Sequence, residues 1–167
     1  MRQYKVLGFR RRRLGITNYE KRLNLLKSRK TRIVVRRSNN YITIQFINYI
    51  PTGDKVLLTI TSRSLKKIGW KHSCKNIPAA YLTGVYSAKV ALGKNIVEGI
   101  PDLGIYNIIK GNFIFAVLKG ILDGGLKIPV SGDVFPVEGR LKGDQTKNKD
   151  VFKKDFESLL NKIRSEK

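Results

Sequence analysis

Few residues in this 167-residue chain are of types that could carry out catalysis. The chain has one histidine, His72, and one cysteine, Cys74, which lie two residues apart in the cationic segment 70–75. A Cys and His pair at this spacing matches no nucleophilic protease, and two candidate ligands are too few for a structural zinc site. A buried thiol is the simpler interpretation of Cys74. The sequence therefore predicts no catalytic residue, no metal site and no cofactor.

The carboxylates and glycines add no catalytic pattern. Asp102, Asp123 and Asp133 lack the spacing typical of a two-metal centre, and Gly93–Lys94 does not belong to a phosphate-binding GxxxxGK[ST] motif. No site for a small-molecule substrate is predicted. An RNA-processing enzyme is kept as an alternative, although it rests on fold analogy alone, and it would cleave RNA in the presence of Mg²⁺.

Positive charge dominates the composition instead. The chain has 34 Lys and Arg and 12 Asp and Glu, for a net charge of +22 at pH 7. Residues 1–37 contain 14 of the cations and a single acid, Glu20, which gives this segment a net charge of +13. An excess of this size favours a polyanionic ligand, above all a phosphate backbone that releases its condensed counterions on binding.

A membrane surface is the alternative polyanion. No apolar run approaches the roughly 20 residues of a membrane-spanning helix, and neither end carries a lipidation motif. Residues 1–6 also lack the apolar stretch of a signal peptide. We therefore expect a cytoplasmic protein that does not bind membranes, with a peripheral membrane protein as the weaker alternative.

The densest positive charge is the run Arg10–Arg13, which follows Phe9. Because no acid lies nearby, we expect residues 1–16 to form an extended basic arm that becomes ordered only on a polyanion. Arginine favours RNA over other polyanions, since its guanidinium group forms bidentate contacts with phosphate and stacks on bases. A nuclear-localisation signal or a solvated tail remains an alternative for this run.

Aromatic residues are interleaved with the cations. They are Tyr4, Phe9, Tyr19, Tyr41 and Trp70. Flat rings among guanidinium groups are typical of proteins that bind single-stranded or looped RNA. We expect Tyr4 and Phe9, which lie in the arm, to contact RNA, whereas Tyr41 fits packing and stacking equally well.

The periodicity of apolar residues predicts the elements that position these groups. Thr17–Glu20 has the form of a capping box, so a helix should begin there. Tyr19, Leu23 and Leu26 then recur at helical spacing, and the rest of the helix is largely basic. We expect the apolar stripe to pack on the domain and the basic face to meet RNA.

Alternating apolar residues then indicate a sheet. Strands are expected over residues 33–35, 41–49 and 56–60. Ile42, Ile44 and Phe46 point to one side of the second strand, and turns at 38–40 and 51–54 separate the three. A three-stranded antiparallel meander is therefore predicted.

Helical patterns return after the meander. Helices are expected over residues 64–68, after Pro78, over 113–123 and over about 149–164, with a fourth strand over 102–108. The segment from residue 128 is rich in Pro and Gly and should form a surface connector. Phe152 and Phe156 share one face of the last helix, which should pack on its own domain or, alternatively, on a neighbour. The order βββαβα predicts a mixed α/β fold with an arm (1–16), a domain (17–133) and a C-terminal extension (134–167).

Six motifs are spaced along the chain. They are Arg10–Arg13, Asn18–Leu23, Arg36–Asn40, Gly69–Lys71, Pro78–Gly84 and Phe115–Gly120. Their order and spacing resemble those of the ribosomal protein L18 family, in its archaeal and eukaryotic branch. The resemblance extends from the N-terminus to about residue 133, and the length of the chain is similar to that of the archaeal members.

This resemblance implies a three-layer α/β domain related to the ribonuclease H-like motif but without its catalytic acids. It also implies a structural constituent of the large ribosomal subunit, and not an enzyme. Such a protein binds 5S rRNA and helps to attach it to 23S rRNA in the central protuberance, beside the ribosomal protein L5 family and other proteins of the protuberance. Transferred to this sequence, the expected rRNA contacts are Arg10, Arg11, Arg12, Arg13, Tyr19, Arg22, Arg36, Arg37, Ser38, Asn39 and Lys71.

Overall fold

A four-stranded mixed sheet organises the part of the chain that the computed structural model describes, residues 7–146 and 149–165. The strands are β1 (Arg32–Arg37), β2 (Ile42–Ile50), β3 (Gly53–Thr61) and β4 (Ile100–Asp102). Their order is β3-β2-β1-β4, in which β1–β2 and β2–β3 are antiparallel and β4 runs parallel to β1. The predicted mixed α/β class is confirmed.

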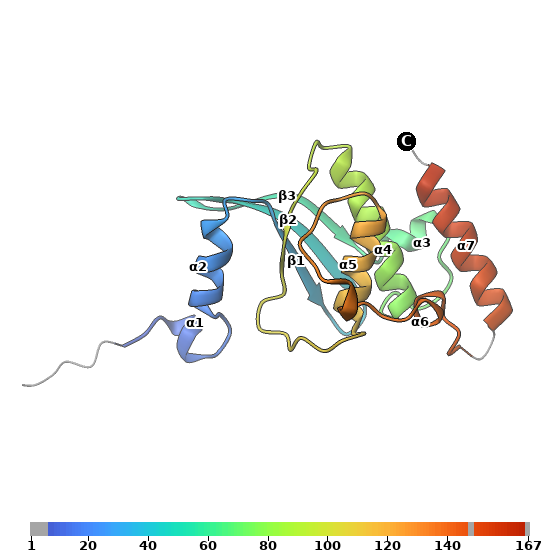
Figure 1. The fold of residues 1–167 in the computed structure, drawn as a ribbon, viewed down its shortest axis with the longest axis horizontal. Coiled ribbons are helices and arrows are strands. Elements are labelled where there is room, and N and C mark those ends of the chain that lie inside the picture. Colours follow the sequence, from blue (N-terminus) through green and yellow to red (C-terminus); the bar gives the residue numbers. More distant parts are fainter. Residues whose placement is uncertain (1–6, 147–148, 166–167) are drawn as a thin grey trace, which may run out of the picture.

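The alternation in β2 sets the two faces of the sheet. Ile42, Ile44 and Phe46 are fully buried, whereas Thr43 and Gln45 between them are half-buried. Successive side chains of a strand point to opposite faces, so only one face of β2 meets the core. Beyond Arg32, the first residue of β1, strands β2 and β3 continue as a projecting two-stranded ribbon (Figure 1).

Helices make up much of the remaining chain. They are α1 (Arg10–Arg13), α2 (Tyr19–Lys27), α3 (Ser64–Ile68), α4 (Ile77–Leu92), α5 (Phe113–Asp123), the short 3₁₀ helix η1 (Gly132–Val134), α6 (Glu138–Lys142) and α7 (Lys149–Ser165). The helices predicted over 64–68, after Pro78, over 113–123 and over 149–164 are confirmed. The segment from residue 128 was expected to be a turn-rich surface connector. It contains the short helices η1 and α6, and Leu141 anchors α6 in the core.

Two glycines bring α4 and α5 into direct backbone contact. A Cβ atom on Gly84 would lie 2.3 Å from the carbonyl oxygen of Val117, and one on Gly120 would lie 2.2 Å from that of Tyr81. Both distances are far inside van der Waals contact, so only glycine permits this crossing. The buried faces of the two helices form the centre of the apolar core.

Helix α7 closes one end of that core. Phe152, Phe156, Leu159 and Ile163 are each at most 3 % exposed. The Phe152 ring meets Trp70 edge-on at a centroid distance of 5.3 Å, and other apolar contacts run along the same stripe. The stripe predicted from the sequence therefore packs on the chain's own domain.

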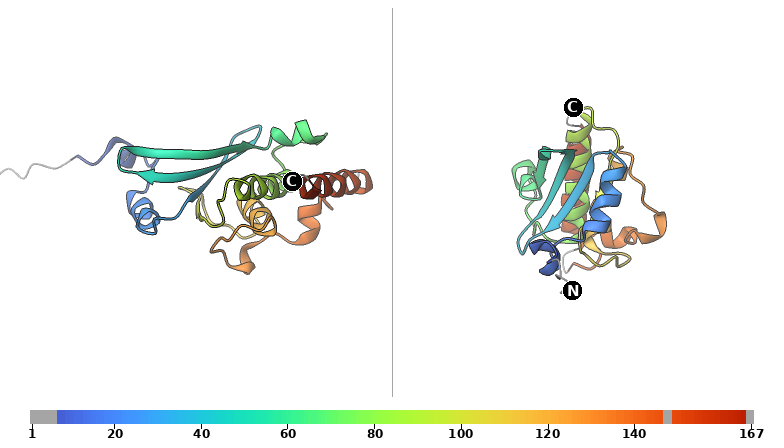
Figure 2. Two further views of the ribbon diagram at one scale, coloured as in Figure 1. Left: turned by 90° about the horizontal axis from the view of Figure 1, so that it is seen from above. Right: turned by 90° about the vertical axis from the view of Figure 1, so that its left-hand side faces the viewer.

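Two expectations about the sheet differ from the structure. The fourth strand covers Ile100–Asp102 and not 102–108, because backbone pairing with β1 ends at Asp102 and residues 103–112 form an irregular loop. The three-layer arrangement is not confirmed. Figure 2 shows α4, α5 and α7 on the same side of β2 and β3, and Thr43 and Gln45 on the other face are partly exposed.

Candidate nucleic-acid interface

Most of the residues expected to contact RNA fall into two groups at opposite ends of the sheet. Helices α1 and α2 lie beside the projecting β2–β3 ribbon, whereas the β1–β2 turn lies at the end near α3 (Figures 1 and 2). Strand β1 connects the two ends. The distance from the Cα atom of Arg32 to that of Arg37 is about 17 Å, for five steps of about 3.3 Å each. We call these two regions the arm end and the turn end.

At the arm end, the arginine run forms a single helical turn and not the extended segment expected from its charge. All four residues of Arg10–Arg13 are exposed. The turn folds back on α2, because Arg11 Nε donates a 2.9 Å hydrogen bond to Thr17 Oγ1 and the Phe9 ring lies 5.2 Å from that of Tyr19. Tyr4 lies outside the described residues.

Helix α2 differs from its prediction in two respects. Its N-cap is Asn18, whose side chain accepts a 3.0 Å hydrogen bond from the backbone N–H of Lys21, while Thr17 is engaged by the arginine run. The helix also buries no residue, and Leu23 is 54 % exposed. It stands beside a two-stranded ribbon, which offers too little apolar surface to cover the predicted stripe.

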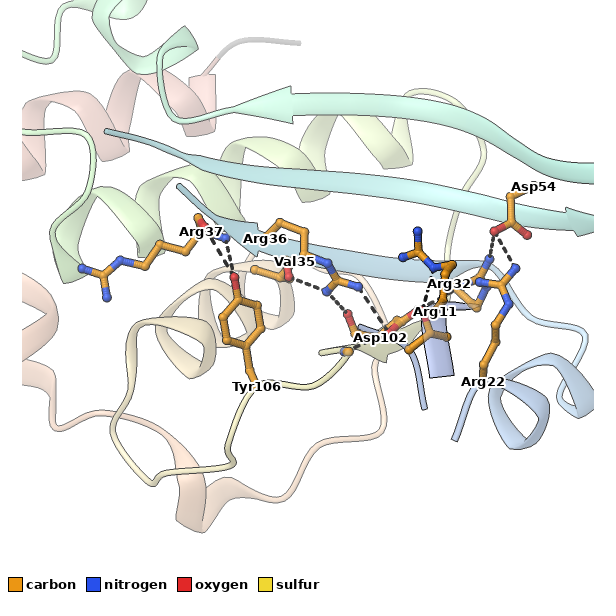
Figure 3. A network of polar contacts seen from close by, with 11 residues as sticks. Arg11, Arg22, Arg32, Val35, Arg36, Arg37, Asp54, Asp102 and Tyr106 are labelled. Carbon is orange, nitrogen blue, oxygen red and sulfur yellow. Dashed lines mark hydrogen bonds and ion pairs between the residues drawn. The ribbon is translucent and has the colours of Figure 1, made fainter. Parts of the chain in front are cut away.

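An ionic network holds α2 and the ribbon to the sheet (Figure 3). Arg32 is 2 % exposed and lies between two carboxylates, 2.7 Å from Asp54 Oδ2 and 3.0 Å from Asp102 Oδ2. Asp54 also accepts a 2.8 Å hydrogen bond from Arg22 of α2. A charge this deeply buried requires such partners, since leaving it unpaired would cost several kcal/mol, by the order of magnitude for buried ions.

Asp54 also shows how the charges balance. Desolvation acts to raise its pKa, but the hydrogen bond from Arg22 and the adjacent positive charges of Arg32 and Arg22 outweigh that effect and hold the pKa below the usual 3.8. Arg36 joins the network through Asp102. Its Nη1 donates to the backbone carbonyl oxygen of Asp102 at 3.1 Å, and its Nη2 lies 3.8 Å from Asp102 Oδ1. Arg22 and Arg36 are thus partly engaged by carboxylates, which the sequence did not indicate.

At the turn end, Arg37 and Ser38 are fixed by local contacts. The Arg37 guanidinium carbon lies 4.8 Å from the centroid of the Phe113 ring, a cation–π arrangement. Ser38 Oγ donates to the carbonyl oxygen of Tyr41 at 2.9 Å and so closes the turn. Asn39 is exposed at the tip. Loop 103–112 is fastened here too, because the Tyr106 hydroxyl bonds to the backbone of Arg37.

The remaining candidates lie apart from both groups or inside the core. Lys71 is exposed in the loop between α3 and α4. Trp70 is 3 % exposed and donates from Nε1 to the carbonyl oxygen of Ser73, so it packs and does not offer a face for base stacking. Tyr41 is half-buried beneath Arg63, whose guanidinium carbon lies 4.7 Å from the ring centroid.

Residues with catalytic or metal-binding chemistry are used structurally. His72 Nε2 pairs with Asp155 Oδ2 at 2.9 Å and so links α7 to the loop before α4. Burial raises the pKa of the Cys74 thiol, as expected for a packed side chain. Within residues 7–146 and 149–165, no group of three or more His, Cys, Asp or Glu could hold a metal ion. No helix in these ranges is long and apolar enough to cross a bilayer.

Together, the mixed sheet, the exposed arginine turn and the cationic turn end place the chain among the basic α/β proteins, with a surface suited to a polyanion. Comparison with known proteins gives the family. Residues 2–101 match the family described as ribosomal large subunit proteins 60S L5, and 50S L18. The chain therefore belongs to this family of ribosomal proteins.

Individual relatives agree with the family assignment. The chain is 49 % identical over 142 residues to the large ribosomal subunit protein uL18 of Korarchaeum cryptofilum. The aligned region covers 85 % of this chain and 72 % of the relative. It is 46 % identical to uL18 of Methanothrix thermoacetophila (85 % and 83 % covered) and 43 % identical to uL18 of Methanococcus maripaludis (92 % and 84 % covered). The family makes the chain a structural component of the large ribosomal subunit in the cytoplasm, and not an enzyme.

Proposed function

We propose that the chain binds 5S rRNA and helps to attach it to 23S rRNA in the central protuberance, beside a protein of the ribosomal protein L5 family and other proteins of the protuberance. The main support is the exposed turn Arg10–Arg13, none of whose guanidinium groups forms an ion pair with a residue in 7–146 or 149–165. Four adjacent cations repel one another, and a phosphate backbone relieves that repulsion while releasing counterions.

The proposal assigns different tasks to the two ends of the sheet. At the arm end, Arg10, Arg11, Arg12 and Arg13 neutralise phosphates, and Tyr19 and Arg22 of α2 support them. At the turn end, Arg36, Arg37, Ser38 and Asn39 make further contacts, and Lys71 adds one beyond α3. Phosphate contacts set the position and orientation of the protein, whereas contacts with base edges provide specificity.

Two structural proposals accompany the functional one. The chain divides into an arm (1–16), an rRNA-binding domain (17–133) and a C-terminal extension (134–167). The domain is related to the ribonuclease H-like motif. Three antiparallel strands followed by helix, parallel strand and helix support this relation.

Affinity measurements across a salt series test the functional proposal. Purified protein is titrated with 5S rRNA and with an unrelated structured RNA of similar length. We expect 5S rRNA to bind tighter by at least about tenfold, and this preference to persist at high salt, because contacts beyond phosphate neutralisation do not depend on counterion release. Equal affinities with parallel salt slopes would indicate a generic polycation and contradict the proposal.

A further inference from the structure

A groove lies at the turn end, where several segments that are distant in sequence meet. One part, of about 560 Å³, is lined by the β1–β2 turn, the loop before α4 and loop 103–112. A second part, of about 620 Å³, extends past the starts of α4 and α5 to α6. The two parts share four residues, Arg37, Lys75, Asn112 and Phe113, and so form one continuous feature, which we call the turn groove.

Its lining is positively charged. Arg37, Lys75 and Arg140 line the groove, whereas no aspartate or glutamate does. Within residues 7–146 and 149–165, none of these three cations forms an ion pair, and Arg37 is held in place by the ring of Phe113. The buried Arg32, by contrast, is matched by two carboxylates. The three cations of the groove lie together without such partners, so they are available to an anionic ligand.

The lining is also rich in hydrogen-bond donors. Asn76 and Asn112 each use the side-chain oxygen to cap a helix, accepting from the backbone N–H of Ala79 at 2.9 Å and of Phe113 at 2.6 Å. Their side-chain amino groups remain as donors beside the cations. Tyr106 and Ile109 add a flat ring and an apolar side chain to the same lining. A matching ligand carries negative charge, several acceptors and a flat apolar face.

We propose that the turn groove binds one unpaired nucleotide of the RNA, as a second contact that is independent of the arginine turn. This inference rests on the proposed function, because it takes RNA as the ligand. The phosphate lies against Arg37 and Lys75, and the base lies near Tyr106 with its edge toward the amide groups. A hollow of several hundred Å³ fits a small ligand and not a duplex, and only an unpaired base has its edge free for hydrogen bonds.

An acidic protein segment is the competing occupant. Ile105, Ile108 and Ile109 in the adjoining loop are 60 %, 68 % and 61 % exposed, and they could contact a protein. RNA is favoured because the groove itself combines unpaired cations, amide donors and an aromatic ring, which is the combination that a nucleotide requires.

The test uses the full chain and two paired substitutions. Lys75→Ala with Arg140→Ala removes two exposed cations of the groove. Lys127→Ala with Lys154→Ala is the matched control, because both lysines are exposed, do not line the groove and form no ion pair within the described ranges. Each protein is titrated with 5S rRNA across a salt series, and nucleotides protected from chemical modification are mapped on the RNA.

We expect the groove variant to lose about tenfold or more in affinity at 0.15 M salt and to show a salt slope shallower by about one to two, while the control changes by less than about threefold. Unpaired nucleotides protected by the wild type should become reactive with the groove variant but stay protected with Arg11→Ala/Arg12→Ala. If the wild type prefers 5S rRNA and the groove variant matches the control, the inference is overturned while the proposed function stands.

Two further outcomes separate the remaining possibilities. If the wild type does not prefer 5S rRNA, the proposed function fails. The groove is then tested by measuring how the wild type and the groove variant bind a single-stranded oligoribonucleotide and a duplex of equal length. A loss confined to the single strand supports the groove, and equal binding by wild type and groove variant overturns it. Unchanged RNA affinity with lost binding of a polyglutamate peptide overturns the RNA assignment in favour of an acidic protein.

Discussion

Helices α2 and α7, which lie toward opposite ends of the chain, are attached to the domain by different forces. Helix α7 buries Phe152, Phe156, Leu159 and Ile163, and its contacts are mainly apolar. Helix α2 buries nothing, and the ion pair between Arg22 and Asp54 is its principal link to the sheet.

This difference assigns the two helices to different tasks, α7 to the stability of the fold and α2 to the binding surface. Burial of apolar side chains contributes most of the free energy of folding, so α7 is part of the core. A helix attached by charges leaves its own surface open, and α2 supports the arginine turn at the edge of the molecule. The comparison predicts that substitutions in α7 change unfolding, whereas substitutions at the arm end change RNA affinity.

The largest expected effect is at Phe156, whose ring stacks on Tyr81 at a centroid distance of 5.9 Å. Phe156→Ala should lower the free energy of unfolding by about 3–5 kcal/mol, because it removes buried surface and leaves a cavity. Leu23→Ala in α2 is the control and should change it by less than about 0.5 kcal/mol. Urea denaturation measures both. Similar losses in the two variants would remove the distinction between the helices.

The next effect is on binding. Arg11→Ala/Arg12→Ala should weaken the affinity for 5S rRNA by about ten- to a hundredfold at 0.15 M salt and make the salt dependence shallower. The free energy of unfolding should change by less than about 0.5 kcal/mol, because both side chains are exposed and only the exposed hydrogen bond from Arg11 to Thr17 is lost. Titration with RNA and urea denaturation of the same preparation provide the two measurements. An unchanged salt slope would exclude the turn as a phosphate contact.

Asp54→Asn addresses the link itself. It removes the carboxylate shared by Arg22 and Arg32. The free energy of unfolding should fall by about 1–2 kcal/mol, which is less than the loss for a fully buried ion pair because Asp54 is partly exposed. Amide hydrogen exchange in α2 should speed up, while exchange in α7 should not. Equal exchange rates in wild type and variant would show that another contact holds α2.

The same substitution should change the acid sensitivity of the protein. The pKa of Asp54 is lower in the folded state than in the unfolded chain, so its contribution to stability is present above pH 3.8 and is lost as the pH falls through the lower folded value. Stability measured between pH 5 and the acid range should therefore fall less steeply in Asp54→Asn than in the wild type. A parallel decline would indicate that other carboxylates account for the acid sensitivity.

The smallest expected effect is at Tyr81, which donates a 3.0 Å hydrogen bond to Asp123 Oδ2. Burial first, and then the charge of Asp123, raise the pKa of Tyr81 above the usual 10. Tyr81→Phe keeps the ring on which Phe156 packs and should cost about 1 kcal/mol. It should also lessen the loss of stability above pH 10, where tyrosines ionise in the unfolded chain. A cost as large as that of Phe156→Ala would mean that this hydrogen bond between α4 and α5 contributes as much to stability as the apolar packing of Phe156.

Strong local periodicity made much of the fold predictable. The alternation of Ile42, Ile44 and Phe46 gave β2, and the apolar run ending at Gly124–Gly125 gave α5 with its observed bounds. The stripe of α7 was also correct, because four apolar residues on one face must be covered. The prediction of strand β4 was displaced because the strand has only three residues, which is too short for a periodic signal.

The candidate interface was less predictable, since its geometry depends on distant partners. Arg32 is a cation in a strand, and nothing local distinguishes it from a solvated residue. Its partners Asp54 and Asp102 lie 22 and 70 positions further along the chain. The turn groove has the same origin, because residues from the β1–β2 turn, loop 103–112 and α6 meet only after folding.

The position of α7 along the chain has a consequence for biosynthesis. A protein emerges from its N-terminus, so the arginine turn and α2 are made before Trp70 and Tyr81, and both rings are made long before residues 149–165 that cover them. During that interval the growing chain already carries its most basic segment, while two aromatic side chains of the future core lie uncovered. The arm is complete before the domain that carries it can close.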